Sequence, residues 1–251
     1  MQRYKILITN DDGIESPSIQ SLITEFSSNF DIAVVAPRYP QSAKGMSHAH
    51  GDVWVTVTEE FIDGIRWFAV DNSPTTCTSI ALKSLNLKPD LIISGINYGE
   101  NLGLNMFYSG TIGAAWEGAM AGIHSLASSL ELPSGKHFII DKKVDFSVAA
   151  SVTKKIAYKI LHEQPASKLW SINTPTSATS ETEIKLCNIA SVRWNYPIIR
   201  EEKVDQNERK VRFEFDPVNN SYEKGTDIYY LRKGFVTLTK IDQISFPWRS
   251  L

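Results

Sequence analysis

The chain has 251 residues, of which 42% are hydrophobic, so one large α/β domain can bury a core without disulfide bonds. A formal net charge of −2 argues against the broadly basic surface that polymeric nucleic acid usually requires, although a small anion can still bind a locally positive cleft. Two cysteines, Cys77 and Cys187, exclude a disulfide framework and fit a reducing compartment. The opening residues have no signal-peptide pattern, and no apolar run approaches the roughly 20 residues that span a bilayer, so we expect a cytoplasmic protein without a membrane partner.

Short apolar runs alternate with helical periodicity in the first half of the chain, which predicts a mostly parallel sheet covered by helices. Ser16-Pro17 is typical of an N-cap followed by proline at the first helical position, and an apolar stripe continues that helix to Phe26. Further helices are expected at residues 75–85 and from 109 to about 122. The expected strands lie at residues 4–9, 31–36, 53–58, 67–70 and 90–94, with a polar turn at Asp63-Gly64.

The second half of the chain is less regular. It predicts a helix over residues 144–161 and strands at 169–173 and 234–239. Residues 185–230 alternate charged with β-branched and aromatic side chains, which is too polar for a core and typical of an exposed β-hairpin arm that packs on another surface. We therefore predict one α/β domain over residues 1–251, with its core in 1–130 and an extended arm at 185–230.

Polar residues follow three of the predicted buried strands. Asn10-Asp11-Asp12-Gly13 follows the first, Gln41-Ser42 the second, and Gly95-Ile96-Asn97 the strand at 90–94. Ligands of open parallel sheets bind in the crevice at the carboxyl ends of the strands, so these loops are expected to meet there. The two carboxylates, one hydroxyl and one amide oxygen of Asp11, Asp12, Ser42 and Asn97 suit one hard divalent cation such as Mg²⁺, Mn²⁺ or Ca²⁺.

The acid turn also has a simpler interpretation, because Asn, Asp and Gly are the ordinary residues of polar turns. Two adjacent acids that face a sheet crevice repel each other, however, and a cation relieves that repulsion. Gly13 ends the strand, which lets both side chains reach one ion. His48 and His50 offer another metal pair, or His48 a general acid, although histidines at strand spacing more often lie at the surface or serve packing.

Small residues open the predicted helix at Ser109-Gly110-Thr111. They allow a phosphate to approach the free N–H groups of the first helical turn, and Ser109 and Thr111 add hydroxyl donors. The pattern is neither a Walker loop nor Gly-x-Gly-x-x-Gly, so it indicates neither NTP hydrolysis nor dinucleotide binding. A metal site beside an oxyanion cradle predicts hydrolysis of a phosphate ester by a metal-activated water.

Long stretches of the sequence also match the pattern of a known family. The matching segments are, in chain order, residues 6–13, Ala36-Pro37 with Gln41-Ser42, residues 89–103, residues 108–118, Asn173-Thr174-Pro175, Gly225-Thr226-Asp227 and residues 234–239. No single piece is specific, but the ordered combination covers nearly the whole chain. On these residues the chain resembles the SurE survival-protein family.

The resemblance implies a Rossmann-like core with one divalent cation, Mg²⁺, Mn²⁺ or a similar ion, at Asp11, Asp12, Ser42 and Asn97. It also implies catalysis by Asp11 and Asp12. The phosphate contacts that it implies are Asn97, Asn101, Ser109, Gly110 and Thr111. The expected reaction is hydrolysis of nucleoside 5′- or 3′-monophosphates to nucleoside and phosphate. Members of this family form homodimers or homotetramers through extended C-terminal arms, which fits residues 185–230.

The chain departs from the family pattern at several positions that border the expected cleft. Ala43 stands where glycine is usual, Thr76 where an aspartate is usual, and Asn105 where an acid is frequent. Asn72-Ser73-Pro74 replaces the usual Gly-Thr-Pro. These departures leave open a nucleotide sensor that keeps the metal site but catalyses weakly or not at all.

A third hypothesis is a phospho-aspartate enzyme in which Asp11 or Asp12 is the nucleophile. The adjacency of the two acids weakens it, because haloacid-dehalogenase-type enzymes separate the corresponding aspartates by one residue. A trapped phospho-enzyme would support it.

Overall fold

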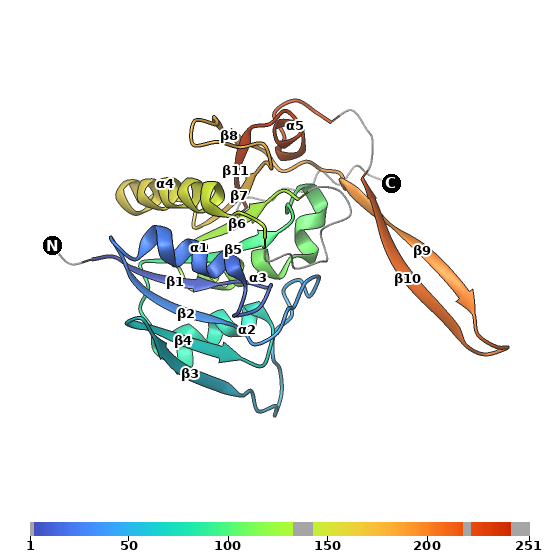
Figure 1. Cartoon of the computed structure of the whole chain (residues 1–251), viewed down its shortest axis with the longest axis horizontal. Coiled ribbons are helices and arrows are strands. Elements are labelled where there is room, and N and C mark those ends of the chain that lie inside the picture. Colours follow the sequence, from blue (N-terminus) through green and yellow to red (C-terminus); the bar gives the residue numbers. More distant parts are fainter. Residues whose placement is uncertain (1–2, 133–142, 218–221, 242–251) are drawn as a thin grey trace.

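A central sheet organises the part of the chain that the computed structural model describes, residues 3–132, 143–217 and 222–241 (Figure 1). Nine strands of these residues form the sheet in the order β3-β4-β2-β1-β5-β6-β7-β11-β8. Neighbouring strands are parallel except for the β3–β4 and β7–β11 pairs. The bounds are β1 Lys5–Thr9, β2 Asp31–Pro37, β3 Val57–Ile62, β4 Ile65–Val70, β5 Leu91–Tyr98, β6 His124–Leu130, β7 Leu169–Thr174, β8 Ile184–Cys187 and β11 Val236–Lys240. The predicted Rossmann-like, mostly parallel sheet is confirmed.

Helices cover both faces of this sheet. One face packs against α1 (Pro17–Phe26) and α4 (Ser147–Glu163), and the other against α2 (Pro74–Ser79) and α3 (Gly110–Met120). The central strands therefore bury both of their faces: Ile6 and Ile8 of β1 point toward α1, while Leu7 lies in the cluster that contains α2. Burial on two sides explains why these strands have continuous apolar sequences rather than alternating ones.

The strand order reverses direction between β1 and β5. From β1 the chain adds β2 on one side, and β5, β6 and β7 then follow on the other side. Such a reversal opens a crevice at the carboxyl ends of the two central strands, where ligands of α/β sheets bind. The Asn10–Gly13 turn leaves β1 at this crevice, as the sequence predicted.

The N-terminal helix is capped as predicted. The Ser16 side chain accepts a hydrogen bond from the Ser18 N–H, and Pro17 occupies the first helical position. The predicted helix at 75–85 is also confirmed, with α2 running on as a π-helical turn, η1 (Ile80–Ser84).

Two predicted strand boundaries are wrong. The strand expected at 53–58 instead occupies Val57–Ile62, and Trp54 is fully exposed, because only the later residues pair with β4 across the Asp63-Gly64 turn. The strand expected to stop at residue 94 continues to Tyr98, with a bulge between Ser94 and Asn97 in its pairing with β6. Asn97 therefore lies on a buried strand rather than in a loop.

The sequence did not predict β6 or the short helix α5 (Asp227–Leu231). The strand β6 was missed because His124–Leu130 contains three serines and reads as polar, yet every residue of it is buried between β5 and β7. A 3-10 helix, η2 (Gly103–Tyr108), was also missed.

A long antiparallel hairpin projects from this body (Figure 1). Its strands are β9 (Asn195–Lys203) and β10 (Arg209–Pro217). The predicted C-terminal hairpin is therefore present, but it is shorter than residues 185–230. The reason is that β8 pairs with β11 in the main sheet and α5 packs against β11. Over the three ranges that the structure describes, no helix is both long and apolar enough to cross a membrane.

Candidate functional site

The acid turn after β1 is held by backbone contacts. The Asn10 side-chain amide donates to the Gly13 carbonyl at 2.9 Å, and the Gln41 N–H donates to the Asp11 carbonyl at 2.7 Å. Gly13 has a φ of 95° and packs against the Tyr39–Pro40 peptide, where an added Cβ would lie 3.3 Å from the Pro40 nitrogen. Only glycine combines this conformation with so close an approach. The turn and the loop after β2 are thus fixed against each other.

The carboxylate of Asp11 points at the N-terminus of α3. The Thr111 hydroxyl donates to Asp11 Oδ1 at 2.6 Å, and the Thr111 N–H donates to Oδ2 at 3.2 Å. A Cβ added to Gly110 would lie 2.9 Å from the Asp11 Cβ, so a larger residue there would displace the acid. Burial raises the pKa of Asp11, while the hydrogen bonds from Thr111 act in the opposite direction.

Asp12 is the second buried acid, and its Oδ2 accepts the N–H of Tyr98 at 3.1 Å from the end of β5. Burial raises the pKa of Asp12 well above its ordinary value, and the neighbouring charge of Asp11 adds to that rise. Both acids are at least 95% buried, with exposures of 2% and 5%. Among the described residues, no Lys, Arg or His forms an ion pair with either of them.

Two buried and uncompensated carboxylates side by side need a positive charge to be ionised together. Their oxygens have lone pairs left over after the hydrogen bonds from Thr111 and Tyr98. Within the described ranges, however, no three His, Cys, Asp or Glu side chains cluster as they do in many metal sites. Neutral oxygens must therefore complete any coordination shell, which is the donor set that Mg²⁺ and Mn²⁺ accept.

The two neutral ligands predicted from the sequence differ in position and exposure: one lies on a buried strand and the other in an exposed loop. Asn97 is buried on β5, where its amide nitrogen donates to the Gly99 carbonyl at 2.7 Å, which turns the side-chain oxygen the other way. Ser42 is exposed, in the loop that begins with the Gln41 hydrogen bond to Asp11. The structure thus brings the loop of Ser42 and the strand of Asn97 to the two acids, and their role as ligands stays a prediction.

The N-terminus of α3 is used differently from the simplest prediction. The Ser109 hydroxyl caps the helix by accepting the Ile112 N–H at 3.3 Å, and both groups of Thr111 bind Asp11. The first turn of α3 therefore stabilises a carboxylate of the protein itself, by its N–H groups and its helix dipole. Phosphate contacts at Ser109, Gly110 and Thr111 remain predictions, with the Ser109 hydroxyl hydrogen the donor least committed elsewhere.

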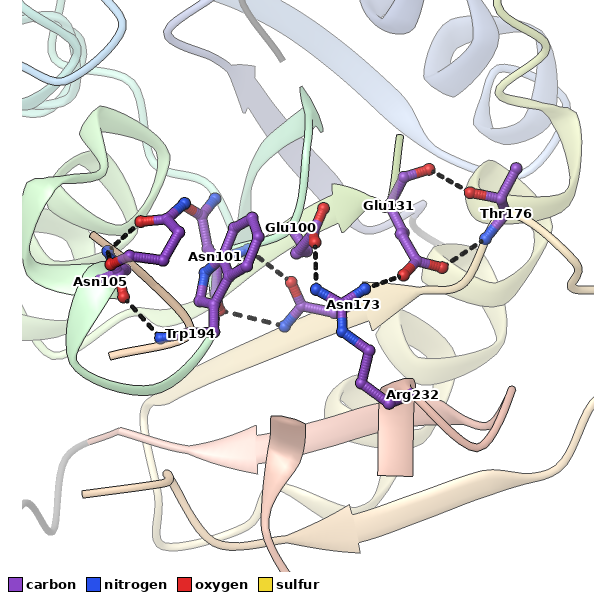
Figure 2. A network of polar contacts seen from close by, with 9 residues as sticks. Glu100, Asn101, Asn105, Glu131, Asn173, Thr176, Trp194 and Arg232 are labelled. Atoms are coloured by element: carbon purple, nitrogen blue, oxygen red, sulfur yellow. Dashed lines mark hydrogen bonds and ion pairs between the residues drawn. The ribbon is translucent and has the colours of Figure 1, made fainter. Parts of the chain in front are cut away.

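Asn101 lies in a polar network that connects the loop after β5 with β6 and β7 (Figure 2). Its side-chain nitrogen donates to the Ser129 hydroxyl at 2.9 Å, and its backbone N–H donates to the Asn173 side chain at 2.7 Å. The Asn173 amide in turn donates to the Asn101 carbonyl at 3.2 Å. Asn101 is therefore held by β6 and β7, and its predicted contact with phosphate is not tested by this geometry.

An arginine that the sequence did not single out supports the same loop. Arg232 follows α5 and forms ion pairs with Glu100, whose side chain is 1% exposed, and with Glu131 (Figure 2). Its guanidinium also lies 5.3 Å from the ring centre of Trp194. Glu100 lies within residues 89–103, one of the segments that match the family pattern, so the sequence could have marked it as a site residue. Nothing in the local sequence marks Arg232 as its partner.

Asn105 connects η2 to the base of the hairpin (Figure 2). Its side chain donates to the Asn195 side chain at 2.6 Å and accepts the Trp194 N–H at 3.0 Å. The position where the family pattern favours an acid thus serves here to anchor the first residue of β9.

The other departures lie near α2. The Thr76 hydroxyl accepts the Ala49 N–H at 2.9 Å, and Ala43 adopts a φ of 61°, a conformation that favours glycine. His48 contacts the Ser79 hydroxyl at 2.9 Å, and Ser79 in turn donates to Glu117. His48 therefore ties its loop to α2 and α3 rather than reaching the acid turn.

Known proteins are similar to this chain over most of its length. The family model described as Survival protein SurE matches residues 6–196. The 5′-nucleotidase SurE of Methanocaldococcus jannaschii is 37% identical over 235 residues, covering 91% of this chain and 88% of that protein. The protein of the same name from Archaeoglobus fulgidus is 35% identical, covering 95% and 92%. The crystal structure of the SurE protein from Aquifex aeolicus superposes with a TM-score of 0.77 at 27% identity, covering 94% and 92%.

Proposed function

The chain belongs to the SurE family, and from that membership we propose that it is a divalent-metal-dependent 5′-nucleotidase. It hydrolyses nucleoside 5′-monophosphates to nucleoside and phosphate. The supporting relatives carry the name 5′-nucleotidase and match this chain over nearly its full length.

One structural observation carries the proposal. Asp11 and Asp12 are buried side by side at the switch point of a parallel sheet, without a basic partner in the described part of the chain. Burying two adjacent carboxylates lowers stability, so such a pair is typical of a site where a cation binds or a reaction takes place. The nearby N-terminus of α3 fits the binding of a phosphate, because it holds Asp11 in place beside the crevice in which the phosphate would lie.

The residues present fit a hard divalent cation. Asp11 and Asp12 would hold it through carboxylate oxygens, with Asn97 and Ser42 adding neutral oxygens. When bound, the ion supplies positive charge to the phosphate oxygens and lowers the pKa of the attacking water. The protein's own groups position these oxygens: Thr111 fixes Asp11, and Tyr98 fixes Asp12.

The remaining polar groups of the crevice orient the substrate. Asn101 sits in a loop held rigidly by Asn173 and Ser129, so its peptide groups are placed before substrate arrives. The Ser109 hydroxyl lies at the N-terminus of α3 and can donate to a phosphate oxygen while still accepting the Ile112 N–H.

Phosphate release tests the proposal. The purified chain is assayed with nucleoside 5′- and 3′-monophosphates and general phosphate esters, with each divalent metal and with chelator. We expect turnover of 5′-monophosphates that chelation abolishes and added metal restores. The Asp12→Asn variant should unfold like the wild type in the absence of metal and should lose turnover. Release that persists after exhaustive chelation would refute metal dependence, and tight nucleotide binding without turnover under any metal would favour a sensor.

The hairpin of β9 and β10 forms the oligomer interface in the same proposal. Ile199, Val211 and Phe213 alternate along one face of the hairpin, and each is more than half exposed, at 53%, 54% and 57%. Isolated two-stranded hairpins are marginally stable in water, so an apolar face on a projecting one is expected to pack against another subunit. This supports a homodimer or homotetramer.

Sedimentation decides this point. The wild-type chain should sediment as a dimer or tetramer. Phe213→Asp should shift it toward monomer, because a charge would enter the face that is proposed to pack against the other subunit. Arg212→Asp, on the opposite face of β10, is the matched control and should leave the assembly intact. A wild-type monomer at all concentrations would contradict the interface.

A further inference from the structure

A cleft of about 570 Å³ opens directly beside Asp12. The acid turn, the N-terminus of α1, the loop after β2, and strands β3 and β4 form its walls. Its volume lies within the range of small-molecule sites, roughly 300–1,000 Å³. The candidate catalytic groups explain only one corner of this space. The rest is large enough for a substrate portion that extends well beyond a phosphate.

The wall of the cleft nearest to the acids is built rigidly. The Ile14 N–H donates to the Pro37 carbonyl at 2.8 Å, and the Arg38 N–H donates to the Val70 carbonyl at 2.7 Å. The contact of Gly13 with the Tyr39–Pro40 peptide fixes this loop at a constant distance from Asp12. The backbone of residue 39 therefore keeps its place relative to Asp12.

The chemistry of the wall suits a planar heterocycle. Tyr39 lines the cleft and is 62% exposed, which leaves its ring face open to a ligand. Arg38 donates to the Thr58 hydroxyl and adds a positive charge to the rim, while Glu60 from β3 adds an acceptor. Exposed aromatic rings flanked by polar groups stack with nucleic-acid bases, because every base has a flat π-face.

The floor of the cleft includes a large aromatic side chain of β4. Trp67 of β4 lines the cleft and is 94% buried, at 6% exposure, and its indole N–H has no acceptor within the described ranges. The N–H itself has almost no accessible surface, so the ring offers the cleft an apolar floor rather than a donor. A nucleoside extends from the acids into this space, whereas an inorganic or small alkyl phosphate would leave it empty.

We propose that this cleft binds the nucleoside part of the substrate, with the base stacked on Tyr39. The proposal rests on the nucleotidase function above and makes it more specific. The phosphate lies at Asp11 and Asp12, the sugar passes Asp12 and Gly13, and the base reaches the face of Tyr39. Tyr39 is a specificity-determining residue, because it contacts the base and not the bond that breaks.

Two substrates that differ only by the base test this placement. Ribose 5-phosphate has the phosphate and sugar of a nucleoside 5′-monophosphate without the base. For Tyr39→Ala we expect a rise in KM of about tenfold for the nucleotide, with kcat nearly unchanged, and no rise for ribose 5-phosphate. Tyr39→Phe keeps the ring and should retain the wild-type KM. Phe61→Ala, an exposed aromatic residue on β3 that does not line the cleft, should change neither substrate.

The other outcomes overturn the assignment. Equal KM values for wild type and Tyr39→Ala on the nucleotide would remove Tyr39 from the base site. An equal KM rise for both substrates would place its effect on the phosphate or the loop instead. If the wild type releases no phosphate from any ester, the nucleotidase proposal fails, and nucleoside binding measured by calorimetry then tests the cleft separately. Binding that Tyr39→Ala weakens about tenfold supports the cleft, whereas equal binding by both proteins, or no binding to the wild type, refutes it.

Discussion

Thr111 holds the Asp11 carboxylate with two hydrogen bonds, one from its hydroxyl and one from its backbone N–H. Groups that orient a ligand carboxylate control metal affinity even though they do not touch the ion. Thr111→Val removes the hydroxyl and keeps the shape of the side chain. We expect affinity for the divalent cation to fall about 10- to 100-fold, measured by calorimetry.

Thr111→Ser is the control for this experiment, because it keeps the hydroxyl that donates to Asp11. It should restore most of the affinity that Thr111→Val loses. If the valine variant binds the cation as tightly as the wild type, Asp11 is not a ligand whose orientation matters. Unfolding curves for both variants distinguish a loss of cation affinity from a loss of the fold.

The two thiols are a second residue-scale case. Burial raises the pKa of Cys187 to about 11 and that of Cys77 still higher. The thiolate is the reactive form, so at pH 8 roughly one Cys187 in a thousand is ionised. We expect both thiols to react slowly with Ellman's reagent in the native chain and at once in denaturant. The native rate should rise about tenfold per pH unit below pH 11. Fast labelling at pH 8 would contradict this environment.

At the scale of elements, Arg232 joins α5 to the loop after β5. It neutralises Glu100, which has almost no exposure to solvent, whereas Arg232 itself is 35% exposed. Removing the arginine takes a cation away from a buried carboxylate. We therefore expect Arg232→Met to lower the free energy of unfolding by about 1–3 kcal/mol in urea titrations.

Arg66→Met provides the matched control. Arg66 pairs with Glu59, and both side chains are about half exposed, so its loss should cost less than about 1 kcal/mol. Adding Glu100→Gln to Arg232→Met should recover part of the stability, because the buried negative charge that lost its arginine disappears. A double variant as unstable as the sum of the two single ones would show that the pair is not coupled.

The sequence predicted those elements whose signals are local. The cap at Ser16, the turn at Gly13 and the apolar runs of β1 and β2 each depend on a few adjacent residues. It failed at β6, whose serines are buried only because β5 and β7 enclose them. It also failed to connect Arg232 with Glu100, which lies 132 residues away. Contacts between distant segments leave no periodic pattern to read.

The candidate site follows the same division. The acids were predicted from their position after a buried strand, which the topology of the sheet explains. The sequence did not predict which group holds Asp11 in place: Thr111 was expected to meet a phosphate, which stays a prediction, and the structure adds its hydrogen bond to Asp11. A donor's partner depends on the three-dimensional approach of two loops, which residue type alone does not determine.

For the whole molecule, the uncompensated acids predict that a cation stabilises the fold. Binding to the native state alone adds RT ln(1 + [L]/Kd), or about 2.7 kcal/mol at a concentration 100 times Kd. For a chain of this size each kcal/mol raises Tm by roughly 2–4 °C. We expect calorimetry with saturating divalent metal to raise the Tm of the wild type by several degrees and to leave that of Asp12→Asn nearly unchanged. Equal shifts in both proteins would place the cation elsewhere.

The anchoring of the hairpin by Asn105 has a further consequence for the assembled protein. The hydrogen bonds of Asn105 attach the base of β9 to the η2 segment, and four residues after Asn105 comes Ser109, the cap of α3. In the oligomer proposed above, a subunit bound to the hairpin would therefore be connected, through Asn105 and η2, to the helix that aligns Asp11. The rate of catalysis would then depend on the number of subunits that are assembled. Dilution that separates the arms should slow each active site, and the slowing should follow the dissociation curve of the assembly.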